Sequence, residues 1–251
     1  MTKLSKINHF SHQHQLVWKH PQEPYQCNGC KELGFGPCYE CEQPNCDYHL
    51  HDECANPDPT ITHPFMRGCT FKFHQKAPQM GYRICDACGR DVLGFVYQCT
   101  HKDPFDLHPH CAKLPHTLAS GEIKLKLKKK LPSPCKTCGS TKTADGFRGW
   151  CYASSSRSEC YHITCVKDTI VRNWKMGHFG QANHETSGLA LESFAPPSRQ
   201  VVVGRGWWWG GSSTARKVCK VVKTAITLVI SAIFGDPTTL ILALAEQLFS
   251  K

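Results

Sequence analysis

The chain has 251 residues, with 17 Cys, 15 His, 30 basic and 20 acidic side chains, and its formal net charge is +10. The odd number of cysteines, the abundant histidines and the lack of an apolar signal segment near the start argue against a secreted disulfide framework. We expect an intracellular protein of the cytoplasm or nucleus, where dense Cys and His indicate metal binding. Several small modules that need metal to fold are then expected.

A Cys-x2-Cys pair followed by a His-x2-Cys pair occurs three times along the chain. Two cysteines at this spacing point both sulfurs from one tight turn, and a His and a Cys three residues apart lie on one side of a helical turn. Each repeat thus supplies the four N and S ligands that tetrahedral zinc requires. The predicted Cys3His sets are Cys27, Cys30, His51 and Cys54, then Cys85, Cys88, His108 and Cys111, and finally Cys135, Cys138, His162 and Cys165.

The repeats predict zinc-stabilised α+β modules in tandem, over residues 9–63, 64–120 and 121–176. In the first two modules a Gly turn and a short aromatic strand follow the Cys-x2-Cys pair. Each module is expected to end in one short helix that begins at its His-x2-Cys turn. A linker over 177–215, which includes three adjacent tryptophans, and a helical tail over 216–251 are expected to follow.

The remaining Cys and His residues predict a second zinc site in each of the first two modules. Ten residues lie between Cys30 and Cys41, as between Cys88 and Cys99, so Cys41 is the counterpart of Cys99 and Cys38 is left over. The first module's set is His14, Cys41, Cys46 and His63, with His12 as an alternative to His14. The second module's set is Cys69, Cys99 and His116, with His101 or Asp103 as the fourth ligand.

The third module offers only Cys151 and Cys160 beyond its first set, with no suitable histidine before them. We therefore expect one site there, and about 4–5 Zn²⁺ ions in the whole chain.

Residues 123–130 alternate apolar and basic side chains and predict an exposed amphipathic strand. Its lysines suit an edge strand that must avoid pairing with another sheet, or else a strip that binds phosphate. Residues 117–150 carry 8 basic and 2 acidic side chains, whereas residues 1–116 carry 11 and 12. Attraction to an anionic partner must therefore come from this segment or from the tail.

The tail predicts two helices separated by Gly235, the second opening at Asp236-Pro237 and ending near Phe249. The first is amphipathic, with a polar stripe that begins at Arg216 and Lys217. Its apolar part is shorter than the ~20 residues of a membrane-spanning helix. We expect a helical hairpin that lies on an anionic membrane surface, associates with a second copy, or folds onto the chain's own modules.

The order His14-x12-Cys27-x2-Cys30, then Cys46-x4-His51-x2-Cys54, resembles the C1 zinc finger, and more closely its divergent, cysteine/histidine-rich form in plants. The phrases Cys69-Thr-Phe-Lys-Phe and Asp106-Leu-His108-Pro-His-Cys111-Ala are similar to that family's sequences. The resemblance covers about residues 9–175 and implies C1-like modules with a small β-sheet, a short helix and two zinc ions each. It also implies binding and signalling rather than catalysis. The short stretch between the Cys pairs removes much of the groove that binds lipid, so we do not expect diacylglycerol binding.

Together these features predict a non-catalytic zinc-binding adaptor for protein partners in signalling, with membrane contact through residues 216–249 as an addition. The alternative is a nucleic-acid-binding zinc-finger protein that uses the lysines of residues 124–130. An enzyme is not expected, because ligand sets of four leave zinc no open coordination position.

Overall fold

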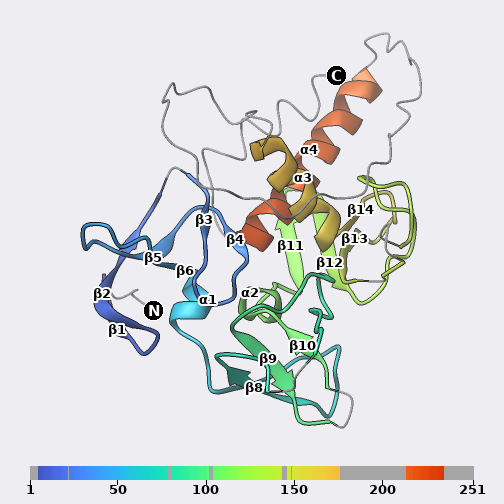
Figure 1. Cartoon of the computed structure of the whole chain (residues 1–251). Coiled ribbons are helices and arrows are strands. Elements are labelled where there is room, and N and C mark those ends of the chain that lie inside the picture. The colour runs from blue at the N-terminus through green and yellow to red at the C-terminus, as the bar shows by residue number, and fades with distance from the viewer. Residues whose placement is uncertain are drawn as a thin grey trace.

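The computed structural model describes residues 5–21, 23–78, 81–101, 104–142, 146–147, 149–175 and 213–234. Within these residues the chain forms three four-stranded antiparallel sheets, one for each Cys/His repeat, which lie side by side (Figure 1). The tandem of small α+β modules is therefore present. Most of the predicted linker and the predicted second tail helix lie outside the described residues.

The first module is built around a sheet in the order β1-β2-β5-β6. Leu16, Tyr39 and Leu50 fill its core and are at most 1% exposed. A two-stranded ribbon, β3-β4, carries the first Cys-x2-Cys turn. The elements are β1 (Lys6–His9), β2 (His12–Lys19), β3 (Tyr25–Gln26), β4 (Leu33–Gly34), β5 (Cys38–Cys41), β6 (His49–Leu50) and α1 (Asp52–Ala55).

The second module has the sheet order β10-β9-β8-β7. Its first strand, Thr60–Thr62, pairs with Thr70–His74 and not with the first sheet, so the predicted module boundary at residue 63 is too late. The reason is that β7 is the first strand of a hairpin whose second strand, β8, belongs to the second sheet. The elements are β7 (Thr60–Thr62), β8 (Thr70–His74), β9 (Val96–Cys99), β10 (Asp106–Leu107) and α2 (Pro109–Ala112).

The third module has the order β11-β12-β13-β14, and its first strand likewise lies before the predicted boundary at residue 121. The lysine-bearing strand β12 lies between β11 and β13, so the edge-strand interpretation of its lysines is wrong. The helix α3 has 13 residues and is longer than the predicted short helix. The elements are β11 (Thr117–Ser120), β12 (Ile123–Lys128), β13 (Cys151–Ser154), β14 (Cys160–His162) and α3 (Ile163–Lys175).

The first tail helix, α4 (Ser213–Phe234), packs against α3, β11 and β12, as Figure 1 shows. The ring of Phe234 also meets Phe35 of the first module edge to face at 4.9 Å between centroids. Within the described residues no helix combines the length and apolarity needed to span a membrane. The part of the apolar face of α4 toward its C-terminal end packs on the body of the protein. Its buried members are Ala225, Ile226, Val229, Ile230 and Ile233.

Neighbouring modules are joined by a contact that repeats. The residue before β9, Phe95, donates its backbone N–H to the Gly29 carbonyl in the first Cys-x2-Cys turn at 2.9 Å. The residue before β13, Trp150, donates in the same way to Ala87 in the second turn at 2.8 Å. The corresponding residue before β5 is Pro37, which has no N–H to donate.

Each of these aromatic rings also meets a buried histidine of the preceding module. Phe95 lies 6.1 Å from the His9 ring, and Trp150 stacks on His63 at 4.4 Å. Strand register makes His9 and His63 equivalent. His9 lies two residues after Ile7, which pairs with Leu16 on β2, and His63 lies two residues after Ile61, which pairs with Phe71 on β8. The same register places exposed Ser120 at this position in the third module. The two seams are thus one docking geometry used twice.

The first seam tolerates no side chain at Gly94, because a Cβ there would lie 2.0 Å from the Gly29 carbonyl oxygen. We predict that Gly94→Ala lowers the free energy of unfolding by about 1–3 kcal/mol, the usual cost of overpacking. Urea unfolding of the zinc-loaded protein measures this. Leu93→Ala is the control, since Leu93 is 59% exposed and should change little. An unfolding midpoint for Gly94→Ala equal to that of the wild type would show that the seam is not tightly packed.

Candidate metal centres

In each of the three predicted Cys3His sets, all four donor atoms lie within 4.8 Å of one another. The histidine faces the sulfurs through Nδ1 in every case: His51 lies 3.4 Å from Cys30, His108 lies 3.4 Å from Cys88, and His162 lies 3.6 Å from Cys138. These short donor-to-donor separations are those that a tetrahedral zinc ion needs.

The three Cys-x2-Cys turns share one backbone geometry. In the first, Lys31 has φ = 66° and donates its N–H to the Cys27 carbonyl at 2.9 Å. Gly89 and Gly139 do the same in the other two turns, at 2.7 and 2.8 Å. The backbone N–H of the ligand histidine then donates to the first sulfur at 3.4 Å in all three modules. The backbone hydrogen bonds fix the shape of the turn, and the N–H of the ligand histidine favours the thiolate form of the first sulfur.

The electrostatics of these sets favour a bound cation. A hydrogen bond from Cys165 lowers the pKa of the Cys135 thiol to about 3, against the opposing effect of burial. Burial alone would lower the pKa of His108, yet the neighbouring cysteines, Cys85 and Cys88, raise it well above its usual value. The far ring nitrogen of His108 lies 3.0 Å from the Asp91 carbonyl oxygen, which orients the ring as metal-bound histidines require. The residues present therefore fit zinc.

The second set of the first module consists of His12, His14, Cys41 and Cys46. Cys41 Sγ lies 3.5 Å from His14 Nδ1, and Cys46 Sγ lies 3.5 Å from His12 Nε2. His12 and His14 are thus members of one set and not alternatives. They are two residues apart on β2, and this spacing puts both on the same face of the strand, a signal that the sequence did contain.

The assignment of His63 to that set is wrong, because the structure places this residue in the seam between the second and third modules. Its ring stacks on Trp150 and lies 5.4 Å from His116. Burial lowers the pKa of His63 to about 4, so the ring is neutral at pH 7. The register of β7 against β8 determines this position, and the spacing of ligands along the chain cannot reveal it.

The second module brings together Cys69, Cys99 and His101, with Cys69 Sγ 3.5 Å from His101 Nδ1. Asp103, the other proposed ligand, lies outside the described residues. His116 is not a member of this group, since its ring contacts Phe65 at 5.9 Å in the seam. The group thus contains three donors among the residues that the structure describes.

Strand register explains why the third module departs from this pattern. One buried apolar residue takes the same place in each sheet, namely Leu16, Phe71 and Leu125. Its partner on the next strand is Cys41 in the first module, Cys99 in the second and Ser154 in the third. Two residues before the buried position stand His14, Cys69 and Ile123 respectively. Neither Ser154 nor Ile123 is a usual zinc ligand.

Three of the leftover cysteines, Cys38, Cys151 and Cys160, lie in β-strands as ordinary buried thiols. Burial raises the pKa of Cys151 to about 12 and that of Cys38 to about 12. Cys160 lies 3.0 Å from the Ser133 hydroxyl. None of the three belongs to the Cys3His set of its own module.

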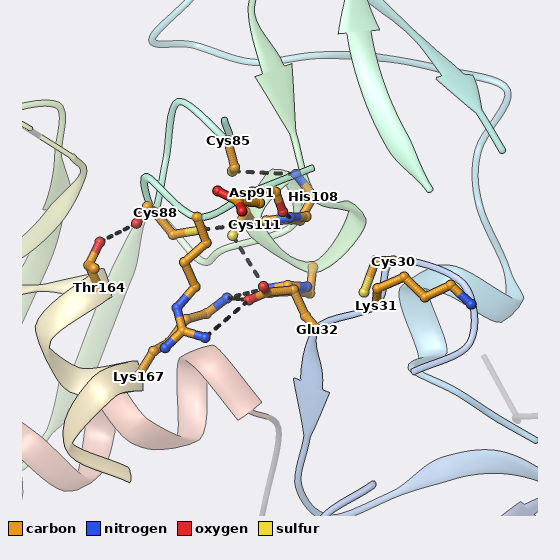
Figure 2. Close-up of polar contacts among 12 residues, drawn as sticks. Cys30, Lys31, Glu32, Cys85, Cys88, Asp91, His108, Cys111, Thr164 and Lys167 are labelled. Carbon is orange, nitrogen blue, oxygen red and sulfur yellow. Dashed lines mark hydrogen bonds and ion pairs between the residues drawn. The ribbon is translucent and has the colours of Figure 1, made fainter. Parts of the chain in front are cut away.

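A buried ion pair lies beside the second Cys3His set, where all three modules meet (Figure 2). Lys167 of α3 donates to the Glu32 carboxylate of the first module at 2.7 Å, and its side chain is 3% exposed. Its ammonium also lies 2.7 Å from His110 Nε2 of the second module. Burial lowers the pKa of Lys167, but the Cys88 thiolate and Glu32 outweigh this and raise it.

The Lys167 ammonium balances the negative charge of the second Cys3His set. Three thiolates, one neutral imidazole and one Zn²⁺ carry a net charge of −1, and a buried charge is costly unless it has a partner. Lys167 supplies that partner from another module, and Thr164 of the same helix donates to the Cys88 carbonyl. The sequence does not mark Lys167 for this role, since it differs from a solvated helical lysine only through tertiary contacts.

We predict that His12→Gln removes one zinc ion from the protein and that His63→Gln removes none. The reason is that, of these two histidines, His12 belongs to the set with Cys41 and Cys46, whereas His63 lies in the seam. Native mass spectrometry after dialysis against a weak chelator gives the count. The reverse result would restore the His63 assignment.

We also predict that Lys167→Met lowers the free energy of unfolding by about 3 kcal/mol, the lower end of the cost of breaking a buried ion pair. The variant removes the nearer cation of the buried Glu32 carboxylate and leaves Arg90, 4.0 Å away. Adding Glu32→Leu should recover part of the loss. Arg172→Met, at an exposed position of the same helix, should have little effect. Chemical unfolding of the four proteins measures the coupling, and a double variant no more stable than Lys167→Met would contradict it.

Comparison with known proteins supports the geometry of the first module. Residues 10–55 match the family model of the C1 domain, a span that contains both four-donor sets of that module. No curated protein and no solved structure matches the chain. Over the first module the chain is therefore similar to the C1 domain, and the two modules that follow repeat the Cys3His geometry of the first.

Proposed function

We propose that this chain is a non-catalytic, zinc-organised scaffold that binds other proteins inside the cell and serves in signalling. The observation that carries the proposal is the completeness of the ligand sets. Four groups of Cys and His each present four donors, and most of these side chains are buried. Zinc held by four protein ligands acts as a structural element, because catalysis needs an open coordination position.

The arrangement of the modules supports binding more than chemistry. The two seams and the buried Lys167–Glu32 pair join the modules into one body, so their outer faces keep fixed positions relative to one another. Residues 1–116 are nearly neutral in formal charge and expose several large apolar side chains. Aromatic and apolar side chains of this kind serve as anchors in protein interfaces. They are Phe10, Tyr82 and Leu93, which are 57%, 80% and 59% exposed.

Lipid binding is a weaker candidate function, both for the first module and for α4. The stretch between the two Cys pairs of the first module, where a C1 finger would form its lipid groove, contains Phe35, which is 2% exposed against α4. The apolar face of α4 is in turn buried against the third module. Contact of either segment with a membrane would require the other to be released.

A metal count tests the zinc scaffold directly. We predict 4–5 zinc ions per chain by native mass spectrometry, and loss of near-ultraviolet circular dichroism when a strong chelator removes them. The physical reason is that the buried thiolates repel one another without the cation. Fewer than three ions per folded chain would rule the scaffold out.

Proximity labelling in cells tests the partner side of the proposal. Point variants serve better than deletion of the tail, because α4 contributes to the core of the third module. A Tyr82→Ala/Leu93→Ser variant is compared with Gln75→Ser, an exposed polar position of the same module. We expect the wild type and Gln75→Ser to share a set of labelled proteins, part of which the double variant loses. A wild-type set no different from that of the free labelling enzyme would contradict the proposal.

A further inference from the structure

Three lysines form a straight row on the outer face of the third module. Lys124, Lys126 and Lys128 alternate along β12 with Leu125 and Leu127, and the leucines are buried while the lysines are exposed. A strand advances about 3.4 Å per residue, so successive ammonium groups are attached about 7 Å apart along one line. We call these three residues the lysine row.

No acidic side chain lies beside the lysine row in the register of the sheet. The cross-strand neighbours are Ala119 for Lys124, Thr117 and Ala153 for Lys126, and Cys151 for Lys128. Acidic partners would normally offset such a row of like charges. The ion pairs of the described residues involve other basic side chains, among them Lys19, Arg83 and Lys113. The row thus presents its charge to solvent.

The fold itself does not require lysines at these positions. The equivalent residues are Gln15, Val17 and Lys19 on β2 of the first module, and Thr70, Lys72 and His74 on β8 of the second.

The neighbouring strand β13 also differs in charge and polarity from its counterparts β5 and β9. Where the third module has Ala153, the register places Glu40 in the first module and Gln98 in the second. Lys19 of the first module is paired with Glu42 at 2.5 Å. The third module thus has more lysines and no acidic cross-strand neighbour for them, although its sheet is built in the same way as those of the other two modules. Since β12 is an interior strand, protection of a sheet edge cannot explain them either.

The geometry points to binding of the phosphate backbone of a nucleic acid by the lysine row, without readout of base sequence. A duplex presents one phosphate per about 3.4 Å of axis on each strand, and the strand winds around that axis, so neighbouring phosphates lie farther apart than this rise and a row with a spacing of about 7 Å can follow them. Lysine is a point charge suited to phosphate contact, whereas base readout relies mainly on Arg, Asn and Gln. This inference does not depend on the protein-scaffold function proposed above.

The surroundings of the row favour a nucleic acid over a membrane. Peripheral attachment to a bilayer combines basic groups with apolar side chains that enter it. The exposed large hydrophobic residues of the described chain are Phe10, Tyr82, Leu93 and Val221, and none of them lies on the third sheet. The cross-strand neighbours of the row are Ala119, Thr117, Ala153 and Cys151, and none of them is a large exposed apolar side chain that could enter a bilayer.

Salt-dependent binding of the zinc-loaded full chain to a fluorescein-labelled DNA duplex of random sequence tests the inference. The steepness of log affinity against log salt concentration is about 0.9 for each phosphate that the protein neutralises. A Lys124→Gln/Lys126→Gln/Lys128→Gln variant should thus reduce the steepness by about 2.7. The matched control, Lys6→Gln/Lys72→Gln/Lys76→Gln, removes the same charge from exposed positions of the first two modules and should leave the slope unchanged.

Two further arms make the outcome decisive. A Lys124→Arg/Lys126→Arg/Lys128→Arg variant should keep the slope, and the zinc content of every variant shows that it is folded. Vesicles of phosphatidylcholine with phosphatidylserine, and polyglutamate, replace the duplex in parallel titrations. Absence of duplex binding, equal slope changes in the row and control variants, or a row variant that loses only vesicle or polyglutamate binding would each overturn the proposal.

Discussion

The gathering of three thiolates and one imidazole around a single point is the constraint on which the rest of this structure depends. Modules of this size bury few apolar side chains, and their sheets consist of strands of two to eight residues. Backbone hydrogen bonds shape the Cys-x2-Cys turn, and a zinc ion held by the four donors would join this turn to the helix start that carries the His and the last Cys. Burying those anionic sulfurs without a cation would oppose folding.

The same turn also determines how the modules assemble. Its two sulfurs point inward to the ligand set, while the carbonyl of the second of the two residues between them points outward and accepts the N–H of the next module, at Gly29 and at Ala87. Metal binding inside a module and docking between modules are therefore properties of one backbone segment. Lys167 extends this dependence, because a cation of the third module lies beside the thiolates of the second and holds Glu32 of the first.

The sequence predicted the parts of this structure that depend on local spacing. All three Cys3His sets assemble from the predicted residues, because Cys-x2-Cys and His-x2-Cys are each confined to one turn. The second sites depend on strand register across a hairpin. There the predictions that His63 and His116 are ligands were wrong, and His12 belongs to the same set as His14 and is not an alternative to it. The role of Lys167 and the interior position of β12 depend on which segments pack together, and local spacing carries no record of that.

The first and third modules each lack a group that the observed docking contact uses. A fourth module could not dock before the first in the observed manner, since Pro37 has no N–H, and the third lacks the buried histidine that receives an incoming ring, with Ser120 in its place. Under the binding functions proposed above, the outer faces of the described sheets are the surfaces that partners would contact. These faces differ in kind, nearly neutral and partly apolar over the first two modules and basic along β12 of the third, so one rigid body can present two separate surfaces to partners of different chemistry.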